Sequence, residues 1–247
     1  MLLGLLALLA FASPARAGEA SLAVAANFAE VVEVLAADFE AASGHGLTIS
    51  TGSSGQLFAQ IVNGAPFDIF LSADQKTAEQ LEADGLAVAG TRFTYAIGRL
   101  TLWSADPGLI GEDGAALLEA GGFRALAIAN PDVAPYGAAA RQAMQRLGVW
   151  DGLQDKIVRG ENIGQTHAMV ATGNAELGFV ALSYVLSPQN GQPGSRWDVP
   201  QDLYDPIRQD AVMTARGEAN AAAAAFMAYL ASEEAKAVIK DYGYEVE

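Results

Sequence analysis

Short apolar runs alternate with amphipathic segments along most of this chain. Residues 22–26 form a short apolar strand in this pattern, and residues 47–51 and 68–72 are the next two predicted strands. Apolar residues then recur at helical spacing from Phe28 to Phe39, and Gly44 predicts the end of that helix. The second half repeats this alternation. It predicts strands over 99–104, 126–129, 177–181 and 209–214, helices over 137–147, 162–171 and 219–242, and a loop over 189–200.

This alternation of strands and helices predicts an α/β fold. Its sheets should be mostly parallel and covered by helices on both faces. Polar residues stand where helices are expected to begin. Asn27 is placed to cap the first helix, with Glu30 three residues later to complete a capping box. Ser72 or Asp74 is expected to cap the helix that ends near residue 85.

The first 17 residues have the pattern of a secretory signal peptide. Met1 to Phe11 is almost entirely Leu, Ala and Gly, and Ala15-Arg16-Ala17 fits a small-residue cleavage site. The apolar run is too short for a permanent anchor, and no later segment is long and apolar enough to cross a membrane. We therefore expect export to a bacterial periplasm, with residues 1–17 removed.

The composition narrows the possible chemistry. With 29 acidic against 14 basic side chains, the chain lacks the excess of Lys and Arg that nucleic-acid binding needs. It has no cysteine, which excludes disulfides, zinc–thiolate sites, iron–sulfur clusters and thiol catalysis. Its two histidines cannot form a three-histidine metal site. Hydroxyls, amides, carboxylates and the backbone remain.

Several strand-to-helix junctions share small residues and neutral hydrogen-bond donors. In open parallel sheets, ligands bind beyond the carboxyl ends of the strands, where helix N-termini point inward. Free amide groups at several such N-termini can hold an anion without any cationic side chain. The alternative is that Ser and Asn at these positions only cap their helices. The junctions are residues 25–27, 52–55, 130–137 and 162–166.

Catalytic interpretations have weaker support. Ser54 lies between glycines, but its surroundings lack the fifth-position glycine of a nucleophile elbow. His45 stands in a polar turn where we expect it to be solvated, and His167 is expected to be a surface or packing residue. Asp68 and Asp74 could form a carboxylate pair, although Asp74 fits a helix cap better.

Five segments resemble the periplasmic molybdate-binding proteins of ABC importers. They follow one another in the family's order and extend over essentially the whole mature chain. They are residues 52–57 (GSSGQL), 64–75 (GAPFDIFLSADQ), 147–150 (LGVW), 173–180 (GNAELGFV) and 240–244 (KDYGY).

The resemblance implies a two-lobed, type II periplasmic binding protein fold that binds an oxyanion between the lobes without catalysis. One lobe is expected to comprise residues 18–97 plus 206–247, and the other residues 98–205. Closure about the two crossings, near 97–98 and 205–206, would bury the anion. The implied partner is a membrane permease, and we expect a monomer that binds no nucleic acid.

The resemblance also implies which residues contact the anion. They are Asn27 with Ala26 beside it, Ser54 with Ser53 beside it, and Tyr136 and Ile163 through their backbone N–H groups. Some members add a tyrosine hydroxyl at a position that is Ala181 here, so that donor is missing.

The expected ligand is molybdate or tungstate, with no cofactor and no cation site. The shell contains no carboxylate to accept a proton, which disfavours protonated phosphate. Two alternatives stay open: a receptor for sulfate or another tetrahedral oxyanion, and an exported hydrolase that uses Ser54.

Overall fold

The computed structural model describes residues 17–247. All but the last residue of the predicted signal peptide, 1–17, therefore lies outside the described residues. In the described part of the chain, no helix has the length and apolar character needed to cross a membrane. The strands are β1 (Glu19–Ala25), β2 (Gly46–Gly52), β3 (Ile69–Leu71), β4 (Phe93–Gly98), β5 (Leu100–Ser104), β6 (Leu126–Ala129), β7 (Ile157–Gly160), β8 (Leu177–Ala181), β9 (Ser195–Asp198) and β10 (Ile207–Met213).

Helices connect most of these strands. The α-helices are α1 (Ala29–Ser43), α2 (Ser54–Val62), α3 (Gln75–Ala83), α4 (Gly114–Ala120), α5 (Pro135–Arg146), α6 (Ile163–Ala171), α7 (Leu182–Leu186), α8 (Ala221–Leu230) and α9 (Glu233–Asp241). Short 3₁₀ helices are η1 (Ala26–Phe28), η2 (Asp151–Lys156), η3 (Gln201–Leu203) and η4 (Ala215–Ala219).

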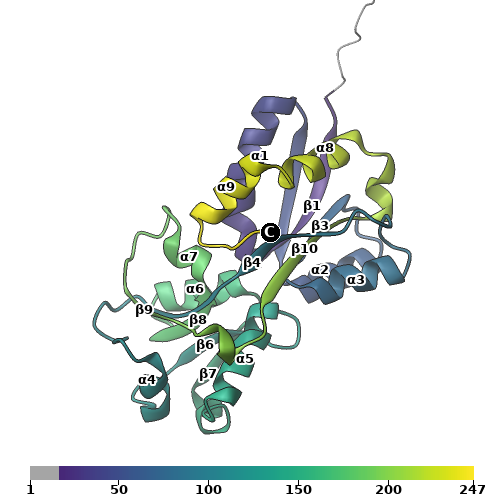
Figure 1. Ribbon diagram of the computed structural model, residues 1–247. Coiled ribbons are helices and arrows are strands. Elements are labelled where there is room, and N and C mark those ends of the chain that lie inside the picture. The colour runs from purple at the N-terminus through teal and green to yellow at the C-terminus, as the bar shows by residue number, and fades with distance from the viewer. Residues whose placement is uncertain (1–16) are drawn as a thin grey trace, which may run out of the picture.

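Within residues 17–247 the strands form two five-stranded sheets, each in its own lobe (Figure 1). The first sheet has the order β2-β1-β3-β10-β4, and the second has the order β7-β6-β8-β5-β9. The chain leaves the first sheet after β4, enters the second directly at β5, and returns from β9 to β10. The chain therefore passes between the two sheets twice, between β4 and β5 and between β9 and β10.

Both sheets are mixed, whereas the sequence predicted mostly parallel pairing. β1 pairs in parallel with β2 and β3, and β6 pairs in parallel with β7 and β8. The antiparallel pairs all involve β10 or β5, which are joined to the crossings. The chain leaves the first lobe along β4 and returns along β10, and these neighbouring strands run in opposite directions.

Each sheet is packed on both faces, as predicted. In the first lobe, α1, α8 and α9 cover one face, and α2 and α3 cover the other (Figure 1). Phe28, Leu35 and Phe226 belong to the first of these cores, which is almost free of solvent contact. In the second lobe, Tyr136 and Phe179 pack on one side of the sheet and Trp103 on the other.

Some elements differ from the prediction. The segment 189–200 was expected to be a loop because it is rich in Gly and Pro, yet it contains β9, which pairs with β5 through tertiary contact. The predicted helix over 219–242 is instead a 3₁₀ turn followed by α8 and α9. Ser232 caps α9 by accepting a hydrogen bond from the Ala235 N–H, which marks the break between the two helices.

The helix ends test the capping predictions. Gly44 ends α1 in the left-handed conformation with φ 72°, and Asp74 caps α3 by accepting from the Thr77 N–H at 2.7 Å. The capping box at Asn27 is wrong. Asn27 lies inside η1, Phe28 occupies the N-cap position of α1, and no side chain caps that helix.

Candidate functional site

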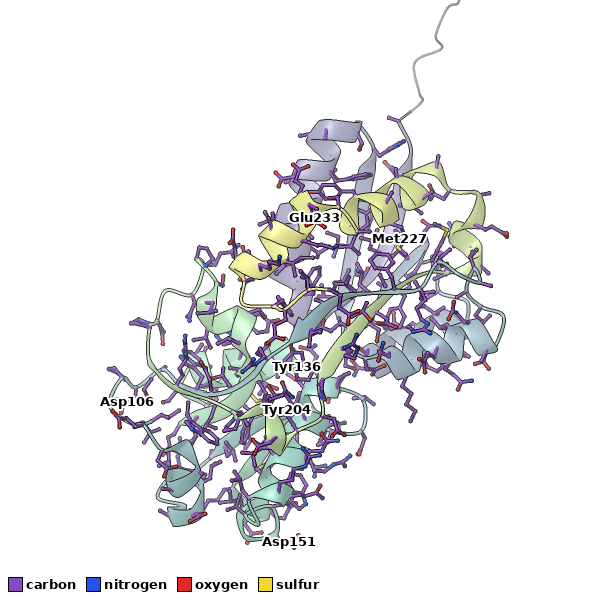
Figure 2. The ribbon with its side chains drawn as sticks, in the orientation of Figure 1. Asp106, Tyr136, Asp151, Tyr204, Met227 and Glu233 are labelled. Carbon is purple, nitrogen blue, oxygen red and sulfur yellow. The ribbon has the colours of Figure 1, made fainter. Side chains whose placement is uncertain are left out.

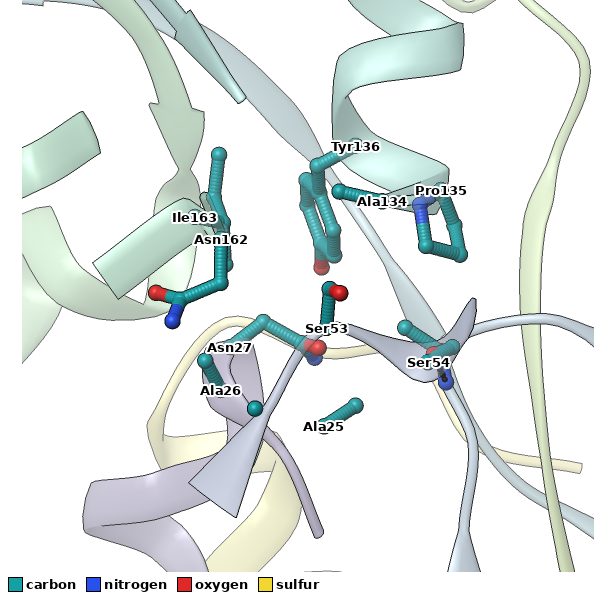
Figure 3. A pocket seen from close by; sticks show the side chains of 12 residues that line it. Ala25, Ala26, Asn27, Ser53, Ser54, Ala134, Pro135, Tyr136, Asn162 and Ile163 are labelled. Atoms are coloured by element: carbon teal, nitrogen blue, oxygen red, sulfur yellow. Dashed lines mark hydrogen bonds between the residues drawn. The ribbon is translucent and has the colours of Figure 1, made fainter. Parts of the chain in front are cut away.

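A small pocket lies between the two lobes, where strands end and helices begin (Figure 3). All six predicted site residues line it. Tyr136, at the start of α5, lies near the meeting of the two lobes in Figure 2. The lining residues are Ala25, Ala26, Asn27, Gly52, Ser53, Ser54, Ala73, Ala134, Pro135, Tyr136, Asn162 and Ile163.

Helix N-termini from both lobes converge on this pocket. Asn27 lies in η1, and Ser54 is the first residue of α2, both in the first lobe. Tyr136 is the second residue of α5, and Ile163 is the first residue of α6, both in the second lobe. The first N–H groups of a helix have no acceptor within it, so these residues present free donors and the positive ends of helix dipoles.

Local sequence explains why two of these helices begin here. The Ser53 side chain accepts a hydrogen bond from the Gln56 N–H at 3.4 Å, and the Asn162 side chain accepts one from the Gln165 N–H at 2.9 Å. Capping turns the side-chain oxygens of these two residues toward their own helices. The next residue in each case, Ser54 or Ile163, then stands at the first helical position with its N–H free.

Ser54 is fully buried, and its hydroxyl has one hydrogen-bond partner in the part of the chain that the structure describes. The Ala73 N–H donates to Ser54 Oγ at 2.8 Å, so the oxygen is used as an acceptor. The hydroxyl hydrogen remains free to donate to an anion in the pocket. Ala73 therefore fixes the position of the Ser54 hydroxyl, and local sequence gave no indication of this contact.

The side-chain amide of Asn27 is committed to the protein. Asn27 Nδ2 donates to Gln209 Oε1 at 2.7 Å and to the Tyr244 hydroxyl at 3.0 Å. Two donors are all that an amide nitrogen has, so the backbone N–H is the donor that Asn27 can offer to a ligand. Burial raises the pKa of Tyr244 to about 12, which keeps its hydroxyl protonated.

Tyr136 also uses its side chain inside the protein. Gln209 Nε2 donates to the Tyr136 hydroxyl at 3.2 Å, and burial raises the pKa of this phenol well above its ordinary value. A Cβ added at Gly98 would lie 2.0 Å from that hydroxyl, so the close approach of β4 requires glycine. The backbone N–H of Tyr136, at the second position of α5, has no acceptor within the helix and is a further donor beside the pocket.

None of the described residues that line the pocket carries a formal charge. Asp74 caps α3, and Asp68 accepts from the Ser21 N–H at 2.8 Å, so the two aspartates serve separate structural contacts. His45 accepts from the Gly18 N–H and is only half-exposed, where a solvated side chain was expected. His167 stacks between two aromatic rings, as a packing residue would.

The pocket therefore lacks the parts of a catalytic centre. No lining residue could act as a general base for Ser54. Among residues 17–247 no cluster of three or more His, Asp or Glu side chains could hold a metal ion. A convergent set of neutral donors is suited to holding an anion and releasing it unchanged.

A family model of bacterial extracellular solute-binding proteins matches residues 20–245. The chain belongs to this family. Among curated relatives of this solute-binding protein, "Molybdate-binding protein ModA" of Azotobacter vinelandii is 51% identical over 94% of this chain and 92% of its own. The protein of the same name from Rhodobacter capsulatus is 48% identical over 96% and 92%.

Solved structures agree with this family assignment and confirm the two-lobed fold. The periplasmic molybdate-binding protein of Azotobacter vinelandii superposes with a TM-score of 0.89 at 45% identity, covering 92% of this chain and 99% of its own. The sulfate-binding protein SubI of Mycobacterium tuberculosis superposes with a TM-score of 0.74, but at 13% identity it supports the solute-binding fold alone.

Proposed function

We propose that this protein is a periplasmic receptor that binds molybdate between its two lobes and delivers it to the permease of an ABC importer. It is a binding protein and not an enzyme. The matching family is described as extracellular and the similar solved structure from Azotobacter vinelandii as periplasmic, which supports export. The sequence of residues 1–17 supports the periplasm as the destination. We also propose that it works as a monomer.

One observation carries the proposal. Four helix N-termini present free backbone donors to a single buried pocket in a chain that is 51% identical to a molybdate-binding protein. A buried dianion is costly unless every oxygen finds donors, and donors fixed by helix geometry need little reorganisation. We assign the contacts to Ala26, Asn27, Ser53, Ser54, Tyr136 and Ile163.

The donors also bear on which anion is bound. Molybdate is fully deprotonated at neutral pH, and donors alone suit it, whereas a protonated phosphate also needs an acceptor. No carboxylate lines the pocket to accept that proton. Tungstate has the same charge and shape as molybdate, so we propose that it binds as well. Sulfate is smaller and must be rejected by cavity size.

The lobes are in contact beside the pocket, which supports binding by closure. The Gly55 N–H donates to the Val133 carbonyl at 2.9 Å, and Gln56 Nε2 donates to Glu161 at 3.1 Å. The first lobe, residues 18–97 with 206–247, would move against the second lobe, residues 98–205. The hinge would lie in the two crossings, between β4 and β5 and between β9 and β10.

The proposal is tested by calorimetric titration of the ligand-free mature protein with molybdate, then with sulfate and phosphate. We expect one molybdate per chain, competition by tungstate, and weak or absent binding of the other two anions. Equal binding of sulfate would contradict the specificity for molybdate. Binding of none of the three anions would contradict the receptor function itself.

A further inference from the structure

Two neighbouring hydroxyls on α7 reach from the second lobe into the first. The Tyr184 hydroxyl donates to the Ala26 carbonyl, and Ser183 Oγ donates to the Asn27 carbonyl at 3.1 Å. Both side chains are buried, with exposed fractions of 8% and 5%. Because donors and acceptors lie in different lobes, opening the cleft breaks both hydrogen bonds.

The Ala26 carbonyl belongs to the peptide group between two residues that line the pocket, Ala26 and Asn27. The Ala26 carbonyl shares one planar peptide unit with the Asn27 N–H, which is the donor that Asn27 can offer to an anion. A hydrogen bond at that carbonyl fixes the orientation of the unit and polarises its N–H, which strengthens the N–H as a donor. Tyr184 thus acts on the pocket without lining it.

The second lobe holds the Tyr184 ring in place. The ring stacks on His167 at 4.9 Å with an interplanar angle of 7°, and His167 stacks in turn on Trp103 at 4.9 Å. A Cβ added at Gly164, the second residue of α6, would lie 2.8 Å from the Tyr184 hydroxyl. Gly164 therefore leaves the space through which the phenol reaches Ala26.

The Tyr184 hydroxyl also stays in its donor form. Burial is the main cause that raises the pKa of this phenol above its ordinary value, and it therefore remains protonated at any pH at which the protein works. Deprotonation of Tyr184 therefore does not break this contact.

We infer that Tyr184 is a positioning residue of the anion site, which orients the Asn27 N–H through the Ala26 carbonyl and stabilises the closed form. Ser183 donates to the carbonyl of the next peptide unit, which also accepts from the Tyr244 hydroxyl of the first lobe at 2.7 Å. The inference rests on the proposed oxyanion-binding function and adds a closure-dependent contact that lies outside the pocket lining.

The test is Tyr184→Phe, which keeps the ring and its stacking and removes only the hydroxyl. We expect molybdate to bind about 5- to 10-fold more weakly, mainly through faster dissociation, which is the effect of losing one neutral hydrogen bond. Urea unfolding of the ligand-free variant should match the wild type, because the bond is absent when the lobes are open. Tyr229→Phe is the matched control, since the Tyr229 hydroxyl has no hydrogen-bond partner among residues 17–247.

A second variant tests the same contact by crowding the hydroxyl. Gly164→Ala should displace the phenol and weaken molybdate binding. In the Tyr184→Phe background the same change should cause little further loss of affinity, since no hydroxyl is left to displace. Unchanged affinity in Tyr184→Phe would overturn the inference. The inference would also be overturned if Tyr184→Phe lost as much stability without ligand as it lost in binding free energy. The bond would then be present in both the ligand-free and the ligand-bound protein.

The outcome separates this inference from the proposed function. If the wild type binds molybdate and Tyr184→Phe binds equally well, only the inference fails. If the wild type binds sulfate in place of molybdate, the ratio between variant and wild type is measured with sulfate. In that case the assigned anion is wrong, while the role of Tyr184 is still decided by the ratio.

Discussion

Asn27 Nδ2 donates to Gln209 Oε1 at 2.7 Å, across 182 positions of sequence. Gln209 is fully buried on β10, the strand that returns from the second lobe, and its own Nε2 donates to the Tyr136 hydroxyl at 3.2 Å. One amide thus connects a pocket residue of the first lobe with a pocket residue of the second. Neither contact uses the backbone N–H groups of these two pocket residues.

Replacing Gln209 should expose the effect of charge beside the pocket. In Gln209→Glu at pH 8, the new carboxylate can accept hydrogen bonds from three neighbours: Asn27 Nδ2, the Tyr95 hydroxyl and, after rotation, the Tyr136 hydroxyl. These hydrogen bonds stabilise the carboxylate in its charged form. We expect at least about 10-fold weaker molybdate binding than in Gln209→Met, which is neutral and of similar size. Calorimetry of both variants measures the difference, and equal affinities would show that this position does not influence the anion electrostatically.

Ser54→Ala should reduce both binding and stability. It removes a donor to the anion and leaves the buried Ala73 N–H without its 2.8 Å partner. We expect about 1–3 kcal/mol less stability to urea and about 10-fold or greater loss of affinity. Ser53→Ala removes a weak cap and should cost about 1 kcal/mol of stability with a smaller loss of affinity. Full affinity in Ser54→Ala would remove Ser54 from the site.

Gly55→Ala should change binding and stability in opposite directions. A Cβ at Gly55 would lie 3.0 Å from the Val133 carbonyl oxygen and 3.1 Å from its Cα, which obstructs closure. Alanine favours a helix over glycine by about 1 kcal/mol, so the ligand-free protein should be equally or more stable. We expect a raised Kd in calorimetry together with an unchanged or raised urea midpoint.

A glycine without close neighbours provides the control for this variant. Gly152→Ala places its Cβ in open space and should leave the affinity unchanged. If Gly55→Ala and Gly152→Ala both bind as tightly as the wild type, the cleft can close around the added methyl group. The Gly55–Val133 contact would then play no part in binding.

His167 should make the protein less stable in acid. Burial lowers the pKa of His167, so the folded state favours the neutral ring, while the unfolded chain takes up a proton below about pH 6.5. The contribution of His167 to the unfolding free energy is therefore complete above that pH and decreases as the pH falls toward the pKa of the folded state. Urea titrations at pH 7.5 and 5.5 should show a smaller acid loss in His167→Phe, which preserves the stacking.

Carboxylates also titrate in this range, so the contribution of His167 is obtained by comparing the acid loss of stability between variants. His45→Gln is the control, because His45 is the other histidine of the chain. An acid loss in His167→Phe as large as that of the wild type would show that the buried ring does not contribute. The stacking between Trp103 and Tyr184 would then be the only role of His167 that the structure supports.

The sequence predicted what short-range patterns determine. Helical spacing and capping residues are local features of the sequence. The starts of α2 and α6, just after Ser53 and Asn162, were therefore predictable, and so were the strand-to-helix junctions that line the pocket. The family resemblance then assigned Tyr136 and Ile163 to the same pocket, and the structure places both in its lining.

Contacts between distant segments could not be predicted in the same way. Asn27 was expected to cap a helix, because nothing near it in sequence indicates that Gln209 and Tyr244 accept from its amide. β9 lies in a segment rich in Gly and Pro and becomes a strand by pairing with β5. Tyr184 carries no local pattern of a functional residue, and its role follows from the approach of the two lobes.

The partners of Asn27 impose an order on the assembly of the protein. A ribosome makes residue 27 long before residues 209 and 244, and until those follow, the amide of Asn27 has neither acceptor. Any partly synthesised chain that stops short of Tyr244 therefore lacks at least one of the two side chains that accept from the Asn27 amide. The ability to capture an anion consequently arises only late in the life of each new molecule, when nearly the whole chain has been made.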